Sequence, residues 1–200
     1  VSLFGGSANY IYAGTHKSGT LYGSTYVHGY GGRFGVFGGS RYGKVTGDTH
    51  IYIYGGRYDV YGASHVSTGY VENVFIEIFD LYGTTDIGEF CGGVYDGVYE
   101  KNYYPVNNTI NIDIHGGTFN SVYGGGLNDW VVGKETTVRN GIQLNIENAT
   151  IKGSVYLAGK YGSIDGNSTL RIINSKINDS VYAGGQGGTN RAGHVIQSDV

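Results

Sequence analysis

Short segments in which apolar residues occupy alternate positions recur along the chain. They are Ile51-x-Ile53, Val74-x-Ile76-x-Ile78, Ile110-x-Ile112-x-Ile114, Ile142-x-Leu144-x-Ile146 and Leu170-x-Ile172, with Val27-x-Gly29 as the weakest member. A period of two predicts β-strands that bury one face. Each segment leads into a residue type that tolerates a left-handed backbone, so we expect a tight corner there. The expected corner residues are Gly31, Gly55, Asp80, Gly116, Asn148 and Asn174.

A second phrase accompanies these segments and consists of an aliphatic residue, an aromatic residue and two or three small residues. Its aromatic positions are Phe4, Phe37, Tyr61, Phe90, Tyr123, Tyr156 and Tyr182. Subtracting successive positions gives spacings of 33, 24, 29, 33, 33 and 26 residues. We expect these rings to form one structural aromatic column, because stacked rings stabilise neighbouring coils and fix their register.

Units of 24–33 residues with two strands and two corners are typical of a solenoid, in which each unit buries its apolar face only against its neighbours. We therefore predict an all-β fold, a single-stranded parallel β-helix (β-solenoid) of about six to seven coils. The range 1–200 reads as one continuous solenoid segment that begins and ends within a coil. This predicts a fragment of a longer chain, and uncapped coil edges also permit end-to-end self-association.

The repeated phrases resemble those of right-handed parallel β-helix proteins of the pectate-lyase-like class. They are most similar to the glycine- and tyrosine-rich repeat regions of bacterial surface proteins and adhesins, over roughly residues 1–185. The resemblance implies right-handed coils and an extracellular or cell-surface location. It does not select an activity, because the same scaffold carries lyases, hydrolases, tailspikes, adhesins and stalks.

Composition narrows the classes of partner. The chain has 38 Gly, 20 Tyr and only one Pro, and its glycines follow no three-residue period, which excludes collagen. A net charge of −3 with scattered basic residues argues against a nucleic-acid partner. No apolar run is long enough to predict membrane insertion. The single cysteine, Cys91, is expected to be a buried structural thiol.

Candidate binding residues lie in the variable loops between the second phrase and the next strand, at 8–24, 65–70, 94–105 and 127–137. Loops inserted at equivalent points of stacked coils project from one face, which is often the binding face. The candidate ligand-binding residues are Tyr95, Tyr99, Tyr103, Tyr104 and Trp130. Their rings suit a glycan or a host or cell-surface protein as partner. The alternative is that these rings fold back and cover the coil.

Candidate chemistry is sparse. Asp80, Asp86 and Glu89 fall in one irregular coil and could supply the paired carboxylates of a glycosidase. A structural role is the preferred interpretation for all three, because Asp80 already occupies an expected corner. The six histidines share no ligand spacing, so neither a metal nor another cofactor is expected.

These observations favour a non-enzymatic extracellular scaffold, the stalk or repeat region of a surface adhesin with an aromatic glycan- or protein-binding face. A self-assembling extracellular filament subunit is one alternative. A polysaccharide lyase or glycoside hydrolase of the β-helix class is the other, and it rests only on the resemblance and the three acids.

Overall fold

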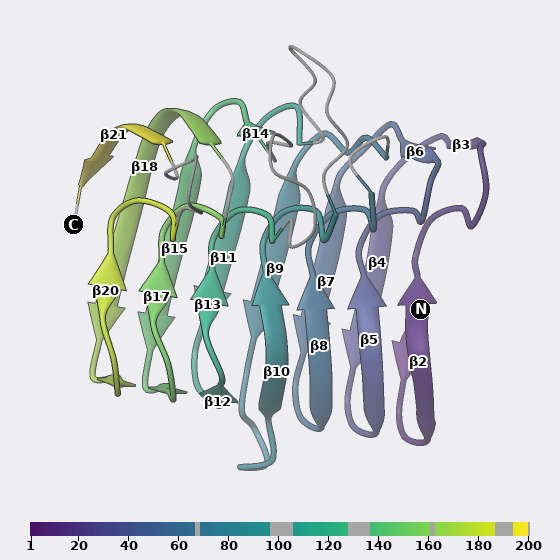
Figure 1. The fold of residues 1–200 in the computed structure, drawn as a ribbon. Coiled ribbons are helices and arrows are strands. Elements are labelled where there is room, and N and C mark those ends of the chain that lie inside the picture. Colours follow the sequence, from purple (N-terminus) through teal and green to yellow (C-terminus); the bar gives the residue numbers. More distant parts are fainter. Residues whose placement is uncertain (67–68, 97–105, 128–136, 161–162, 187–193, 200) are drawn as a thin grey trace.

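The computed structural model describes residues 1–66, 69–96, 106–127, 137–160, 163–186 and 194–199. These residues form parallel β-strands arranged in two large sheets and one small one (Figure 1). The small sheet pairs β3 (Thr20–Leu21) with β6 (Lys44–Val45). No helix occurs among the described residues.

The first large sheet, sheet A, contains the strands with alternating apolar residues. Its members are β1 (Ser2–Leu3), β4 (Thr25–Gly29), β7 (Thr49–Ile53), β9 (Val74–Ile78), β11 (Ile110–Ile114), β14 (Thr137–Val138), β15 (Ile142–Glu147), β18 (Ser163–Ile173) and β21 (His194–Asp199). From β1 to β18 each long strand pairs in parallel with the corresponding strand of the next coil.

The second large sheet, sheet B, contains the strands that precede or carry the aromatic phrase. Its members are β2 (Ser7–Tyr12), β5 (Arg33–Phe37), β8 (Arg57–Tyr61), β10 (Asp86–Cys91), β12 (Thr118–Phe119), β13 (Val122–Tyr123), β16 (Thr150–Ile151), β17 (Val155–Tyr156), β19 (Lys176–Ile177) and β20 (Val181–Tyr182). After β10, each long strand is replaced by two short strands with a bend between them.

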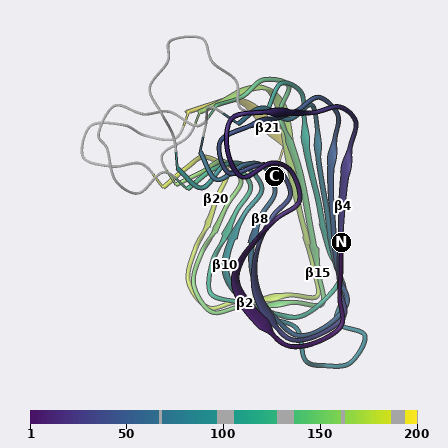
Figure 2. The same cartoon turned by 90° about the vertical axis from the view of Figure 1, so that its right-hand side faces the viewer.

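Seen along the stack, successive coils superpose (Figure 2). Sheet A is nearly straight in this view, whereas sheet B bends inward. This all-β arrangement of long parallel sheets fits the predicted parallel β-solenoid.

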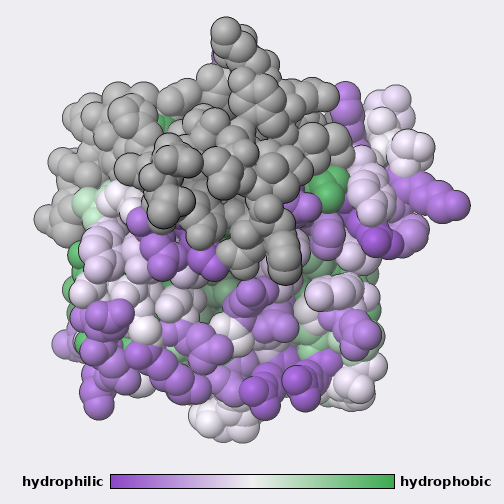
Figure 3. Space-filling model, in the orientation of Figure 1, coloured by the Kyte–Doolittle hydropathy of each residue, from purple (hydrophilic) through white to green (hydrophobic). Residues whose placement is uncertain are grey.

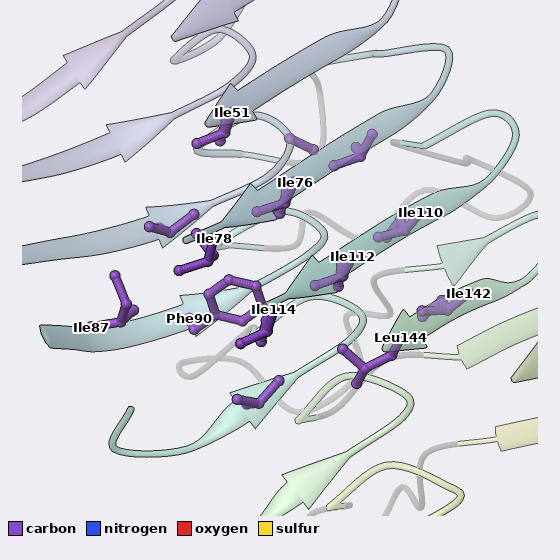
Figure 4. Close-up of a cluster of buried hydrophobic side chains, with 14 of the residues drawn as sticks. Ile51, Ile76, Ile78, Ile87, Phe90, Ile110, Ile112, Ile114, Ile142 and Leu144 are labelled. Carbon is purple, nitrogen blue, oxygen red and sulfur yellow. The ribbon is translucent and has the colours of Figure 1, made fainter. Parts of the chain in front are cut away.

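The core lies between the two sheets and is built from columns of equivalent apolar residues. In sheet A, Ile51 pairs with Ile76, Ile76 with Ile112, and Ile112 with Leu144. All four side chains are almost completely buried. Figure 4 shows these columns together with Phe90 and Ile87, which come from sheet B. The predicted strand segments therefore face the core as the period of two requires.

The corner after the aromatic phrase is closed by glycines that allow neighbouring coils to approach. A Cβ added at Gly62 would lie 2.1 Å from the carbonyl oxygen of Gly92 on the next coil, and one added at Gly92 would lie 2.2 Å from that of Gly124. The Oγ1 hydroxyls of Thr25 and Thr49 donate to the carbonyl oxygens of Gly38 and Gly62 at 2.6 and 2.7 Å. Small residues recur here because the backbones leave no room for a side chain.

The corner after the sheet A strands differs in part from the prediction. Asn148 and Asn174 adopt left-handed conformations, with φ of 53° and 47°. In the glycine coils the corner is present as expected, and its positive φ belongs to the second glycine, at Gly32, Gly56 and Gly117, one residue after Gly31, Gly55 and Gly116. Asp80 has no positive φ either, because the inserted loop that follows it provides Gly83 instead, with a φ of 65°.

The aromatic column also needs correction at two positions. Strand pairing places Cys91, not Phe90, opposite Tyr61 and Tyr123. A β-bulge between Ile87 and Phe90 turns Phe90 into the core, where its ring meets Phe119 at 5.7 Å. Phe4 lies outside the column as well: it stacks on Tyr30 at 4.9 Å, and Tyr12 pairs with Phe37 in its place.

The remaining members of the column stack in two groups on the outer side of sheet B. Phe37 and Tyr61 are 4.3 Å apart, and Tyr12 stacks on Phe37 at 4.9 Å. On the other side of Cys91, Tyr123, Tyr156 and Tyr182 follow one another at 5.0 and 4.7 Å. The column therefore lies outside the main core and forms a small apolar cluster of its own with Cys91 and Leu127.

Candidate functional site

An open groove lies on the outer side of sheet B, over β2, β5, β8 and β10. Its volume is about 560 Å³, within the range typical of ligand sites. It is lined by Ser7, Ala8, Asn9, Tyr10, Arg33, Phe34, Gly35, Arg57, Tyr58, Asp59 and Gly88. Figure 3 shows hydrophilic side chains gathered across the lower half of this side of the molecule.

Register explains how these residues meet. Arg33 pairs with Arg57, and two residues further along the strands Gly35 pairs with Asp59. Since residues two apart on a strand point to the same side, all four positions face outward. The apolar neighbours Phe34, Tyr58 and Val60 point inward and are buried. The groove therefore rests on a rigid and well-packed sheet.

Two glycines allow the groups at the floor of the groove to approach one another closely. A Cβ added at Gly35 would lie 2.5 Å from the carbonyl oxygen of Asn9, and one at Gly88 would lie 2.4 Å from Oδ1 of Asp59. That same carboxylate oxygen accepts a hydrogen bond from the backbone N–H of Glu89 at 2.8 Å. The bulge at Gly88 thus holds Asp59 in a fixed orientation on the floor.

Charge is concentrated on one wall. Nε of Arg57 lies 3.5 Å from Oδ2 of Asp86, and Nζ of Lys152 lies 3.7 Å from Oδ1 of the same carboxylate. Arg33 is exposed and has no ion-pair partner in the described part of the chain. The half-exposed ring of Tyr10 also lines the groove and is tilted against Phe37 at 5.7 Å.

A cluster of aromatic and charged side chains lies beside the glycine corner that follows the aromatic phrase. We call it the corner cluster, and its members are Tyr12, His16, Phe37, Arg41, His65, Tyr95 and Asp96. Tyr95, one of the predicted binding residues, packs edge-on against Tyr61 at 5.1 Å and lies 5.2 Å from His65. A guanidinium nitrogen of Arg41 lies 2.9 Å from Nε2 of His16. Tyr95 thus covers the aromatic column, as in the alternative interpretation of these loops.

Three buried polar atoms of the corner cluster have no hydrogen-bond partner among the described residues: Nε of Arg41, Nδ1 of His65 and Oδ1 of Asp96. Burial lowers the pKa of His65, the nearby Arg41 guanidinium lowers it further, and Asp96 opposes both. The other predicted binding residues, Tyr99, Tyr103, Tyr104 and Trp130, lie outside the described residues, so their role stays a prediction.

The outer face of sheet A carries a second set of rings that the loop-based prediction missed. Tyr26, His50 and Phe75 stack at 4.5 and 4.9 Å, and Tyr30, Tyr54 and Phe79 stack at 4.9 and 5.3 Å. Because the rings lie nearly parallel along the stack, each of them has at least one face against a neighbouring ring. Sugar stacking needs a free ring face, so we interpret these ladders as structural.

The three acids considered for catalysis have separate partners. Asp80 accepts a hydrogen bond from the N–H of Thr85 at 2.8 Å and closes the base of the inserted loop. Asp86 is paired with Arg57 and Lys152 as described above. Glu89 accepts a hydrogen bond from the hydroxyl of Tyr61 at 2.5 Å. Burial first, then this carboxylate, raises the pKa of Tyr61.

Cys91 is completely buried, and burial raises its pKa.

Within the described ranges no group of three or more His, Cys, Asp and Glu side chains could hold a metal ion. The same ranges contain no helix long and apolar enough to span a bilayer.

The groove has a signal in the sequence that could have revealed it. Arg33 and Arg57 each lie four residues before the aromatic residue of their unit, Phe37 and Tyr61. Aligning the units on the aromatic phrase would have brought the two arginines into one outward column.

Comparison of the chain with protein-family models, curated proteins and solved structures found no match.

Proposed function

We propose that this chain is a non-enzymatic extracellular scaffold that binds a glycan in the groove on sheet B, as part of the stalk or repeat region of a surface adhesin. Closure of the two sheets into right-handed coils belongs to the same proposal. The observation that carries it is the set of Arg33, Arg57, Asp59 and Tyr10, which line one groove on packed strands.

The chemistry of this set suits sugar hydroxyls. Guanidinium and carboxylate groups make paired hydrogen bonds with neighbouring hydroxyls, the first as donor and the second as acceptor. The Tyr10 ring supplies an amphipathic wall, with an apolar body and a polar tip. Packed strands hold such groups in position more accurately than loops do.

A binding role is supported over a catalytic one by the separate partners of Asp80, Asp86 and Glu89. Asp80 and Glu89 serve as acceptors in local structure, and Asp86 is held between two cations. A glycosidase needs two carboxyl groups on opposite sides of one scissile bond.

The test is retention of the protein on a panel of immobilised polysaccharides, with the supernatant assayed for new sugar ends. We expect retention without product and loss of retention in Asp59→Asn and Tyr10→Ala. Tyr22→Ala is the matched control, since Tyr22 is 86% exposed and does not line the groove. Thermal melts of all variants separate lost binding from lost fold.

Two results would contradict the proposal. Full retention of both groove variants, with loss in a Tyr103→Ala/Tyr104→Ala/Trp130→Ala variant, would place the site in the loops. Release of new sugar ends would make the protein an enzyme.

A further inference from the structure

Arg33 and Arg57 hold two positive charges side by side on neighbouring strands. Their backbones pair directly in parallel register, which places them about 4.8 Å apart along the stack. Both side chains are exposed and belong to the same wall of the groove. Like charges in directly paired positions destabilise a sheet, so this arrangement has an electrostatic cost that a bound anion would remove.

The surrounding acids leave this cost only partly compensated. Asp86 contacts Arg57 through Nε, at the inner end of the guanidinium group, and it is shared with Lys152. Asp59 uses Oδ1 to accept the N–H of Glu89. No described residue forms an ion pair with Arg33, so the N–H groups of its guanidinium can donate to a bound anion.

We propose that the groove recognises a glycan carrying an oxyanion, a sulfate ester or a carboxylate, with the anionic group seated between Arg33 and Arg57. This inference rests on the proposed glycan-binding function of the same groove. Two guanidinium forks one strand apart offer donors to several oxygens of one anion, the geometry in which arginine binds oxyanions best. Asp59 then accepts from a hydroxyl of the sugar ring.

The sheet also supplies a matched control. Lys176 is exposed and belongs to the same outward column as Arg33 and Arg57, but it lies in a later coil and away from the groove. A variant at Lys176 removes one positive charge from the same face and leaves the proposed site intact. The chain has a net charge of −3, so general attraction to polyanions is not expected.

The experiment compares dextran, dextran sulfate and carboxymethyl-dextran, which share one backbone, as ligands of the whole chain. We expect the two anionic polymers to bind at least about tenfold more tightly than dextran, with affinity that falls as salt rises. Arg33→Gln should weaken binding about tenfold, Arg33→Lys less, and Lys176→Gln should leave it unchanged. A preference between the two anionic polymers identifies the oxyanion.

Two outcomes would overturn the inference. Equal affinity for dextran and its anionic derivatives would show that the groove binds sugar hydroxyls and not the anionic group. The proposal that the groove binds a glycan would still stand. Equal weakening by Arg33→Gln and Lys176→Gln would show diffuse charge attraction in place of a site. Failure of every polysaccharide in the wider panel would instead reject the glycan-binding function itself.

Discussion

Cys91 lies in direct register with Tyr61, one coil further along the stack, and interrupts the outer aromatic column there. Its sulfur packs near the carbonyl oxygens of Gly93 and Val94, at 3.5 and 3.7 Å. The bulge that places Cys91 in the column is the same one that turns Phe90 into the core. A small, buried and polarisable side chain thus fills a position that the neighbouring coils give to a ring.

The thiol of Cys91 should be unreactive in the folded protein. It is completely buried and its pKa is raised, so the thiolate that reacts with disulfide reagents is scarce and shielded. We expect no reaction with an aromatic disulfide reagent at pH 8 and one equivalent per chain in guanidinium chloride. Rapid labelling without denaturant would contradict the buried position. Cys91→Ser should cost about 1–3 kcal/mol in free energy of unfolding, because it buries a hydroxyl.

Substitution of Gly62 tests the close approach of neighbouring coils. In Gly62→Ala the new methyl group would meet the carbonyl oxygen of Gly92 at 2.1 Å, so the backbones must separate. We expect a loss of several kcal/mol in free energy of unfolding, measured by urea denaturation. Gly19→Ala is the control, since the nearest atom there is 3.8 Å away, and it should change stability by less than about 0.5 kcal/mol. Similar values for the two variants would rule out the tight corner.

The left-handed corner at Asn148 predicts that glycine at this position destabilises the protein less than alanine does. Its φ is 53°, which glycine adopts freely and alanine does not. We expect Asn148→Ala to lower the free energy of unfolding by about 1–2 kcal/mol and Asn148→Gly to lower it much less. An alanine variant as stable as the glycine variant would show that the corner is not strained for ordinary residues.

Stability should fall on mild acidification. Burial lowers the pKa of both His50 and His65 in the folded state, so the unfolded chain binds protons more readily. The stabilisation is therefore complete above the ordinary histidine pKa of about 6.5 and is lost as pH falls below it. Urea midpoints between about pH 7 and 5 should show this decline, and His65→Gln should make it shallower. A decline of equal slope in His65→Gln would remove His65 from the explanation.

Much of the fold could be predicted from the sequence, because alternation and the aromatic phrase both follow from one repeated geometry. The buried isoleucines of β9, β11 and β15 lie where the period of two placed them. The prediction failed at Phe90, where Gly88 and Glu89 together face Asp59 and shift the register. A bulge changes which face a residue occupies without changing the local pattern of residue types.

The candidate site was harder to predict, because its residues are isolated in the sequence. Arg33, Arg57 and Asp59 belong to strands that looked ordinary, and only lateral pairing brings them to one wall and floor. Tyrosine-rich loops gave a stronger local signal and drew the prediction away from the sheet. Of those loop residues, Tyr95 contacts the outer aromatic column.

In this protein, the number of residues in a coil does not determine how far that coil advances along the stack. Units of 24–33 residues pair strand to strand in the same register, so the extra residues of a long unit do not enter the paired strands. An insertion in a loop therefore changes what the molecule displays and not how far it reaches. Only duplication of a whole coil extends the rod, by about 4.8 Å each time. The length of the molecule and the residues exposed in its loops can thus evolve separately, the first by duplication of coils and the second by insertion in loops.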